Sequence, residues 1–186
     1  RDRLADNEID GYTFETKTTA GSVANLRLIS DGYIDLAIVQ ADLLSDAYNA
    51  TGTFADKKYQ KGYKAVASLY TECCQIVVRK DSGITGIDDL INKTVSVGAS
   101  ESGTEKNAEQ ILKMSGITDE LINKVNMDYT EAAEKLKAGE IDAFFCTAGT
   151  RTEVIGQLSK ECDIRLISLD DKCIDKMLSS YSLCEK

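Results

Sequence analysis

The residues best suited to chemistry lie in one short stretch, residues 98–105 (GASESGTE). Ser102 and Glu105 have the S-x-x-E spacing of a capping box, which predicts that Ser102 is the N-cap of a helix or lies close to it. Gly103 permits a ligand to approach free backbone N–H groups, and the hydroxyls of Ser102 and Thr104 add two donors. Together with the positive end of the helix dipole, these groups predict a site for an anion.

A carboxylate suits this site better than a polyphosphate does. The nucleotide-binding loop GxxxxGK[ST] requires a lysine after its second glycine, whereas Thr104 follows Gly103 here. The neighbouring Glu101 disfavours a highly charged anion further. An ordinary capped helix that binds nothing has the same pattern, so the anion site is a hypothesis.

The sequence offers little for catalysis or for metal binding. It has no histidine, which excludes a Ser–His–Asp triad and a Cys–His pair. Vicinal Cys73 and Cys74 have no adjacent basic residue that would lower a thiol pKa. Because there is also no C-x-x-C pair, we expect neither a zinc site nor a cofactor. These features favour a binding protein over an enzyme.

The cysteines number six, which is compatible with an oxidising compartment. Cys146 lies in the apolar run AFFC and fits a small buried hydrophobe as well as a half-cystine. Cys162, Cys173 and Cys184 have more polar surroundings, and we regard them as the better candidates for disulfides.

Alternating strand and helix patterns position these residues. Strands are predicted at 12–18, 34–39, 64–70, 75–78, 94–98, 124–129, 141–146 and 164–168. Helices are predicted at 23–30, 41–48, 103–114, 131–138, 152–160 and 173–180, with shorter helical pieces at 88–91 and 119–123. The alternation indicates an α/β fold with largely parallel sheets, in which ligands bind beyond the carboxyl ends of the strands.

One pattern occurs twice along the chain. The first copy is a predicted helix, the residues DGYID (31–35) and a predicted strand. The second copy has the same order, with the residues AGEID (138–142) between the helix and the strand. In both, a glycine is expected to end the helix in a left-handed conformation. We interpret the repeat as two similar lobes, residues 1–79 and 80–186, although common loop chemistry also produces such echoes.

Length and charge limit the function further. With 186 residues, 42% of them hydrophobic, the chain can bury a real core. Its net charge of −9 disfavours nucleic acids and anionic membranes as partners. No apolar run approaches the ~20 residues that span a bilayer. The chain shows no signal-peptide pattern and opens on RDRLADNEIDG, which is typical of a helix already under way, so we expect further residues upstream.

Several stretches together resemble the TAXI family of TRAP-transporter solute receptors. They are TTAGSVANLRLISDGYIDLAIVQAD, then ASLY and QIVVRKDSGI, then VSVGASESGTE, and finally GEIDAFFCTAGT. The resemblance spans nearly the whole chain in the same order. It implies a type II periplasmic-binding-protein fold, an α/β clamshell whose two lobes close on a ligand.

The resemblance also implies a function and a site. Such receptors are extracytoplasmic, in the periplasm or at the cell surface as lipoproteins, and deliver small carboxylates, glutamate and related amino acids among them, to a TRAP membrane permease driven by an ion gradient. We expect a monomer. Carried over by motif, the ligand-binding residues would be Gly21 and Ser22 in the first lobe, Gln40 and Tyr70 on the hinge side, Ser102, Gly103 and Thr104 at the carboxylate, and Ala148 and Gly149 on the opposite wall.

The chain departs from the family pattern in several places. The Gly-rich strand–turn–helix that opens the family, and the segment that returns to the first lobe at its end, are absent, so we expect the first lobe to be incomplete. The family's prolines after ASLY and after FFxxAG are replaced by residues 71–74 and 150–151. These changes leave the identity of the ligand open. Arg151 is a candidate partner for a second ligand carboxylate.

Two other classes of function fit the same fold. A ligand-sensing domain of a membrane signalling protein would differ only in its flanking sequence. An enzyme is the third reading, because the fold also hosts a pyrimidine-precursor synthase, but the absence of histidine and of a clustered cysteine motif counts against it.

Overall fold

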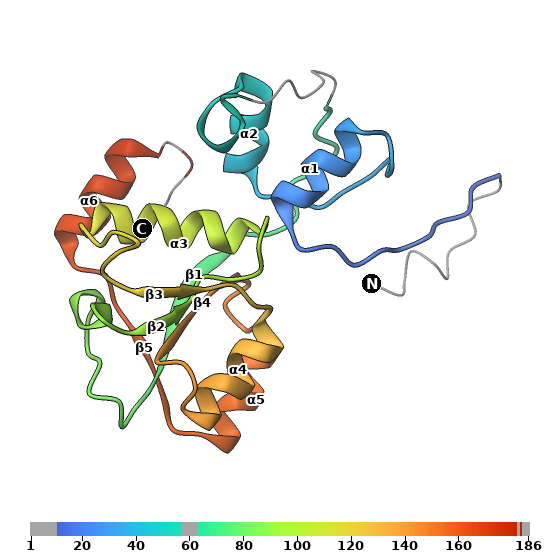
Figure 1. Ribbon diagram of the computed structural model, residues 1–186. Coiled ribbons are helices and arrows are strands. Elements are labelled where there is room, and N and C mark those ends of the chain that lie inside the picture. Colours follow the sequence, from blue (N-terminus) through green and yellow to red (C-terminus); the bar gives the residue numbers. More distant parts are fainter. Residues whose placement is uncertain (1–10, 57–62, 182, 184–186) are drawn as a thin grey trace.

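The computed structural model describes residues 11–56, 63–181 and 183, and its largest element is a five-stranded mixed sheet (Figure 1). The strands are β1 (Cys73–Arg79), β2 (Thr94–Ser96), β3 (Asn123–Val125), β4 (Ala143–Ala148) and β5 (Ile164–Ile167), in the order β3-β2-β4-β1-β5. β2 pairs in parallel with β3 and β4, whereas β1 is antiparallel to both β4 and β5.

The direction of β1 corrects the expectation of a largely parallel sheet. Cys73, at the start of β1, lies opposite Ala148, at the end of β4. β1 therefore enters the sheet at the edge where β4 leaves it, and the two neighbours run in opposite directions. Residues 73–79, which precede the predicted boundary between lobes, form a central strand of this sheet.

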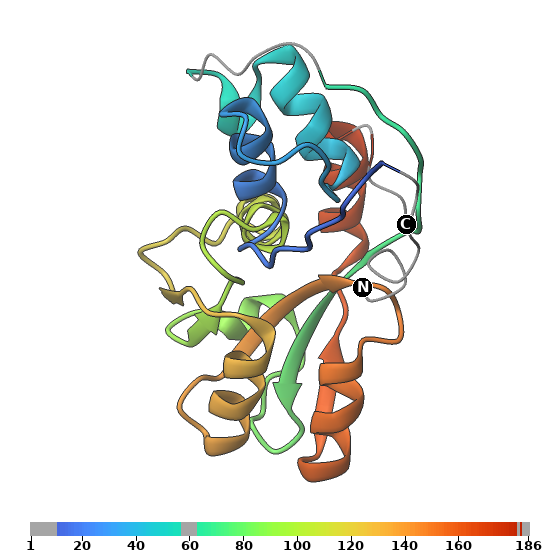
Figure 2. The same cartoon turned by 90° about the vertical axis from the view of Figure 1, so that its right-hand side faces the viewer.

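Helices cover both faces of the sheet (Figures 1 and 2). α3 (Gly103–Met114) and α6 (Asp171–Ser180) lie on one face, and α4 (Tyr129–Ala138) and α5 (Glu153–Glu161) lie on the other. Consecutive side chains of β4 point to opposite faces of the sheet. Phe145 packs against the helix layer that contains α3, and Phe144 packs against the layer that contains α4. Both rings are fully buried, which explains why β4 begins with the apolar run AFFC, residues 143–146.

The N-terminal part of the described chain has a small core of its own. It consists of α1 (Ser22–Ser30), α2 (Ala41–Asn49) and the short 3-10 helix η1 (Gly52–Phe54), which lie beside α3 on the side away from the sheet (Figure 1). Their shared buried side chains are Val23, Leu26, Leu43, Ala47 and Phe54. A second 3-10 helix, η2 (Ile87–Leu90), follows β1.

The strands predicted in this N-terminal part are wrong. Residues 13–20, 34–40 and 63–72 are assigned to no sheet. The run IDLAIV was expected to be covered on both faces, yet Leu36 is 67% and Ile38 65% exposed, and Val66 is 85% exposed. A strand forms only where a neighbouring strand pairs with its backbone, and among the described residues none pairs with these segments. The backbone groups of Ile38 and Gln40 bond instead to the side chains of Asn25 and Ser22.

The predicted helices are confirmed to within a residue or two at each end, with one exception. Asp128 caps α4 by accepting a hydrogen bond from the Glu131 N–H, and Gly139 ends it with a left-handed φ of 75°. The exception is 119–123, where a turn leads directly into β3. Asn123 donates its N–H to Lys93 and pairs with Thr94 of β2, so sheet pairing overrides the local helical pattern.

The cysteine predictions divide into two groups. Cys146 is buried in β4, and burial raises the pKa of its thiol to about 11, as for a small hydrophobe. Cys162 and Cys173 are free thiols, contrary to the disulfides expected of them. Cys173 is buried, with its Sγ 3.2 Å from Ser115 Oγ. Cys184 lies outside the described residues.

None of the helices in the described ranges combines the length and apolarity that crossing a bilayer requires.

The double-sided burial of β4 leads to a test of the core. Replacing the fully buried Phe145 with alanine leaves a cavity and should lower the free energy of unfolding by about 3–5 kcal/mol, measured by chemical denaturation. Leu166→Ala, at a position of β5 that is 47% exposed, is the control and should cost much less. Equal losses for the two variants would contradict the assignment of Phe145 to the core.

Candidate ligand site at the helix N-termini

The start of α3 has the predicted capped geometry. Ser102 is the N-cap, and its Oγ accepts a hydrogen bond of 3.0 Å from the Glu105 N–H. The Glu105 carboxylate turns back to accept from the Glu101 N–H at 2.9 Å, one residue before the cap. Gly98, which has a φ of +96°, lies so close to this turn that a Cβ there would be 2.8 Å from the Thr104 Cβ. The strand β2 thus leads into α3 through a tight turn.

The start of α1 lies directly against the start of α3. Gly21 is the N-cap of α1, with a φ of +145°, and a Cβ on it would be only 2.9 Å from the Ser102 Cα. The Ala24 N–H donates to the Glu101 carbonyl oxygen at 3.1 Å. Arg27 forms an ion pair of 2.8 Å with the Glu101 carboxylate. Two helix N-termini therefore converge at one place, although 80 residues of chain separate them.

The start of α2 reaches the same place through Gln40. Its backbone N–H donates to Ser22 Oγ at 3.0 Å, and its side chain lies against Gly103 with no room for a Cβ there. The Gln40 Nε2 donates to Glu72 Oε2 at 2.9 Å and to Asn107 Oδ1 at 3.1 Å. The structure thus gathers five of the predicted ligand-binding residues: Gly21, Ser22, Gln40, Ser102 and Gly103. Their role in binding stays a prediction.

The hydroxyl of Thr104 already has partners within the protein. It forms a short hydrogen bond with the Tyr129 hydroxyl and accepts from the Thr147 N–H at 3.4 Å. Tyr129 in turn donates to the Thr147 carbonyl oxygen at 2.9 Å. Burial raises the pKa of Tyr129 to about 12, so it stays protonated as a donor. This network ties α3 and α4 to the carboxyl end of β4.

The other predicted residues lie at or near the same edge of the sheet. Ala148 ends β4 opposite Cys73, and the carbonyl oxygen of Gly149 accepts from Thr152 Oγ1 at 2.7 Å. Tyr70 lies on the extended segment before β1 and is 61% exposed. Arg151 is also exposed. Whether these side chains contact a ligand stays a prediction.

Sequence analysis named Glu101 but missed the other charged and polar residues around the site. Glu72, Asp42, Asn107 and the pair Arg27–Glu101 surround the convergent helix starts. Burial raises the pKa of Asp42 above its ordinary value, and the charge of Asp46 adds to this, although hydrogen bonds from the Leu43 N–H and Asn107 oppose it. No motif identifies these residues, because their partners are far away along the chain.

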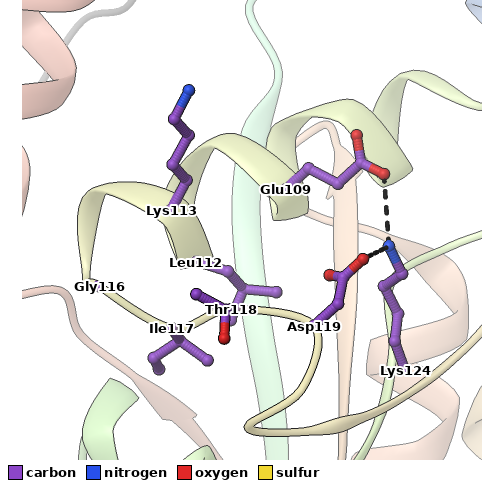
Figure 3. Close-up of a pocket in the computed structure, with 8 residues that line it drawn as sticks. All are labelled: Glu109, Leu112, Lys113, Gly116, Ile117, Thr118, Asp119 and Lys124. Atoms are coloured by element: carbon purple, nitrogen blue, oxygen red, sulfur yellow. Dashed lines mark hydrogen bonds and ion pairs between the residues drawn. The ribbon is translucent and has the colours of Figure 1, made fainter.

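A cavity in the described part of the chain lies away from this site. It has a volume of about 270 Å³ and lies beside the C-terminal half of α3, between Leu112, Ile117 and Lys124 (Figure 3). The Lys124 amine projects between two carboxylates, at 2.9 Å from Asp119 and 3.5 Å from Glu109. Its charge is thereby satisfied inside the protein, so this cavity offers a ligand little beyond a shallow apolar wall.

Comparison with known proteins identifies the family. The sequence pattern of the NMT1-like family matches residues 4–186. The chain belongs to the NMT1-like family. Among the described residues of this NMT1-like protein, no group of three or more metal-ligating side chains gathers.

Two solved structures show the fold. The substrate-binding protein of an amino acid ABC transporter has a TM-score of 0.54 at 18% identity, over 87% of this chain and 62% of its own. The alkanesulfonate-binding protein SsuA from Xanthomonas axonopodis pv. citri, bound to MOPS, has a TM-score of 0.52 at 19% identity, over 81% of this chain and 48% of its own. The NMT1-like chain therefore has the α/β fold of periplasmic binding proteins. It spans less than two thirds of the length of either structure.

The contact between Gln40 and Gly103 can be tested with a matched pair of glycines. Gly103→Ala introduces a Cβ that collides with the Gln40 side chain and should lower the melting temperature by displacing it from Glu72 and Asn107. Gly156→Ala, within α5 where the space is open, should stabilise the protein by up to about 1 kcal/mol because alanine is the better helix former. An equal gain for both variants would show that the Gln40 contact is unimportant.

The buried carboxyl of Asp42 leads to a pH prediction. Because its pKa is raised on folding, the native state holds the proton more tightly, and the free energy of unfolding falls as pH rises through the window above 3.8. Asp42→Asn has no carboxyl at this position, so its free energy of unfolding should not fall in this way. The difference in free energy of unfolding between Asp42→Asn and the native sequence should therefore shift in favour of the variant from about pH 3 to pH 7 in denaturation experiments. The exposed Asp35→Asn controls for net charge. A pH-independent difference for Asp42→Asn would refute the prediction.

Proposed function

We propose that this chain is part of an extracytoplasmic solute-binding protein that captures a small carboxylate for a TRAP-type secondary transporter. The observation that carries the proposal is the convergence of the α1 and α3 N-termini, with Gly21 against Ser102, at the carboxyl edge of β2 and β4. Ligands bind at this edge in open α/β sheets. Convergent helix N-termini direct backbone N–H groups and positive dipole ends at a shared point, which favours a carboxylate.

The close contact of these helix starts fits a closed arrangement of two lobes. In this reading, residues 1–79 supply α1 and α2, and residues 80–186 supply α3 and most of the sheet. The Arg27–Glu101 ion pair and the Ala24–Glu101 hydrogen bond hold the lobes together. A ligand enters when these contacts separate, and its carboxylate then takes the place beside Gly103 that Gly21 now covers.

The choice of a TRAP-type partner rests on the sequence. Five stretches in family order, including VSVGASESGTE and GEIDAFFCTAGT, resemble the TAXI receptors of such systems. The structural neighbours support the coarser point that this fold serves transport, since one belongs to an amino acid ABC transporter and the other binds alkanesulfonates. The proposal therefore includes a membrane permease as partner and a monomeric receptor.

Carboxylate capture is tested by comparing each small acid with its own primary amide. L-Glutamate, L-alanine and succinate should raise the free energy of unfolding, by about 2.7 kcal/mol at a hundredfold excess over Kd, whereas the amides should have little effect. Isothermal titration calorimetry would measure the same affinities directly. Amides that bind as tightly as the acids would contradict the proposal.

The Ser102→Ala variant tests whether the acids bind at the start of α3, and Asp128→Ala is its matched control. Each removes the side-chain N-cap of one helix, α3 or α4, and should cost about 1 kcal/mol of stability. Only Ser102→Ala should also weaken the binding of the acids. Equal effects of the two variants on binding would argue against the start of α3 as the site.

A further inference from the structure

The side chain of Gln40 occupies the start of α3, the place that the proposed function gives to the carboxylate of the ligand. Its Oε1 and Cδ lie where a Cβ on Gly103 would be, so the amide fills the space that this glycine leaves open. The first N–H groups of an α-helix have no partner within the helix and attract an oxygen acceptor. Gln40 therefore brings an amide oxygen to the position where a ligand would bring a carboxylate oxygen.

The nitrogen of this amide holds the side chain in place. Gln40 Nε2 donates to Glu72 Oε2 at 2.9 Å and to Asn107 Oδ1 at 3.1 Å. Asn107 in turn donates to Asp42 Oδ2 at 3.4 Å. These bonds tie together the start of α2, the second turn of α3 and the segment before β1. The bond to Glu72 is the stronger of the two from Gln40, because its acceptor is a carboxylate.

The oxygen of the same amide has no such hold. Gln40 Oε1 is buried, and none of the described residues gives it a hydrogen bond. A buried acceptor without a donor is unfavourable, so this end of the amide favours release while the nitrogen opposes it. A ligand carboxylate carries a full negative charge and bonds to backbone N–H groups more strongly than a neutral amide oxygen does. The side chain is thus held at the helix start in a way that a carboxylate can displace.

We propose that the Gln40 side chain is a built-in occupant of the ligand site, which closes the start of α3 and leaves it when a carboxylate binds. The proposal rests on the proposed function and adds a conformational step to it. Each binding event must first break the bonds of Gln40 to Glu72 and Asn107. The apparent affinity for an acid is therefore lower than the intrinsic affinity, by the fraction of molecules in which the helix start is free.

Truncation of Gln40 distinguishes an occupant from an ordinary ligand contact. Gln40→Ala removes the amide but keeps the backbone N–H that donates to Ser22 Oγ, and α2 loses no cap because the Gln40 side chain makes none. The chain is titrated calorimetrically with L-glutamate and with succinate. Whichever acid binds should bind this variant about tenfold more tightly than the native chain, because no side chain has to be displaced. If Gln40 instead contacted the ligand, its loss would weaken binding.

Two further variants separate release of Gln40 from other effects of the change. Asn107→Ala keeps Gln40 and every charge but removes one of the two acceptors of Nε2, so it should tighten binding of the same acid about threefold. Gln157→Ala, in α5, is the matched control. The Gln157 Nε2 also donates to a carboxylate, Glu153 Oε1, at 3.0 Å, but on the exposed surface. This variant should bind the acid as the native chain does.

The outcomes separate this proposal from the proposed function. A Gln40→Ala variant that binds the acid no more tightly than the native chain would overturn the occupant role and leave carboxylate capture standing. If Gln40→Ala does not fold, Asn107→Ala decides the question by the same comparison. If neither acid binds the native chain or any variant, both the proposed function and this proposal fail.

Discussion

The close packing of three helix starts is the constraint on which the candidate site depends. It requires two positions without side chains: Gly21, where a Cβ would press on Ser102, and Gly103, where a Cβ would collide with Gln40. With glycine at both, α1, α2 and α3 begin within hydrogen-bonding reach of one another. A larger residue at Gly21 would press on the backbone of Ser102, whereas one at Gly103 would displace the Gln40 side chain. The geometry of the site therefore depends on the lack of side chains at these two glycines as much as on the surrounding polar groups.

The distribution of charge around this contact is asymmetric. Backbone N–H groups and dipole ends of the helix starts face it from one direction, whereas Glu72, Asp42 and Glu101 carry negative charge nearby. Arg27 neutralises Glu101 but not the other two.

The second half of the chain was largely predictable because its local and global signals agree. α3 and α4 have an N-cap side chain, an apolar stripe and a clear end, and β4 is an apolar run covered by a helix layer on each face. In the first half, α1 and α2 were equally predictable from local pattern. The three strands predicted there did not form, because a strand is stable only through hydrogen bonds to a neighbour that no local pattern can guarantee.

The sequence by itself determined the cap at Ser102, the glycine that ends α4 and the order of helices, since each depends on residues within one or two turns. It also marked Gly21, Gln40 and Gly103 through a family resemblance. Only the tertiary structure decided that these residues meet, that β1 runs antiparallel between β4 and β5, and that Glu72 lies beside Gln40. Those contacts join residues that are tens of positions apart, so their chemistry follows from packing and is invisible to spacing along the chain.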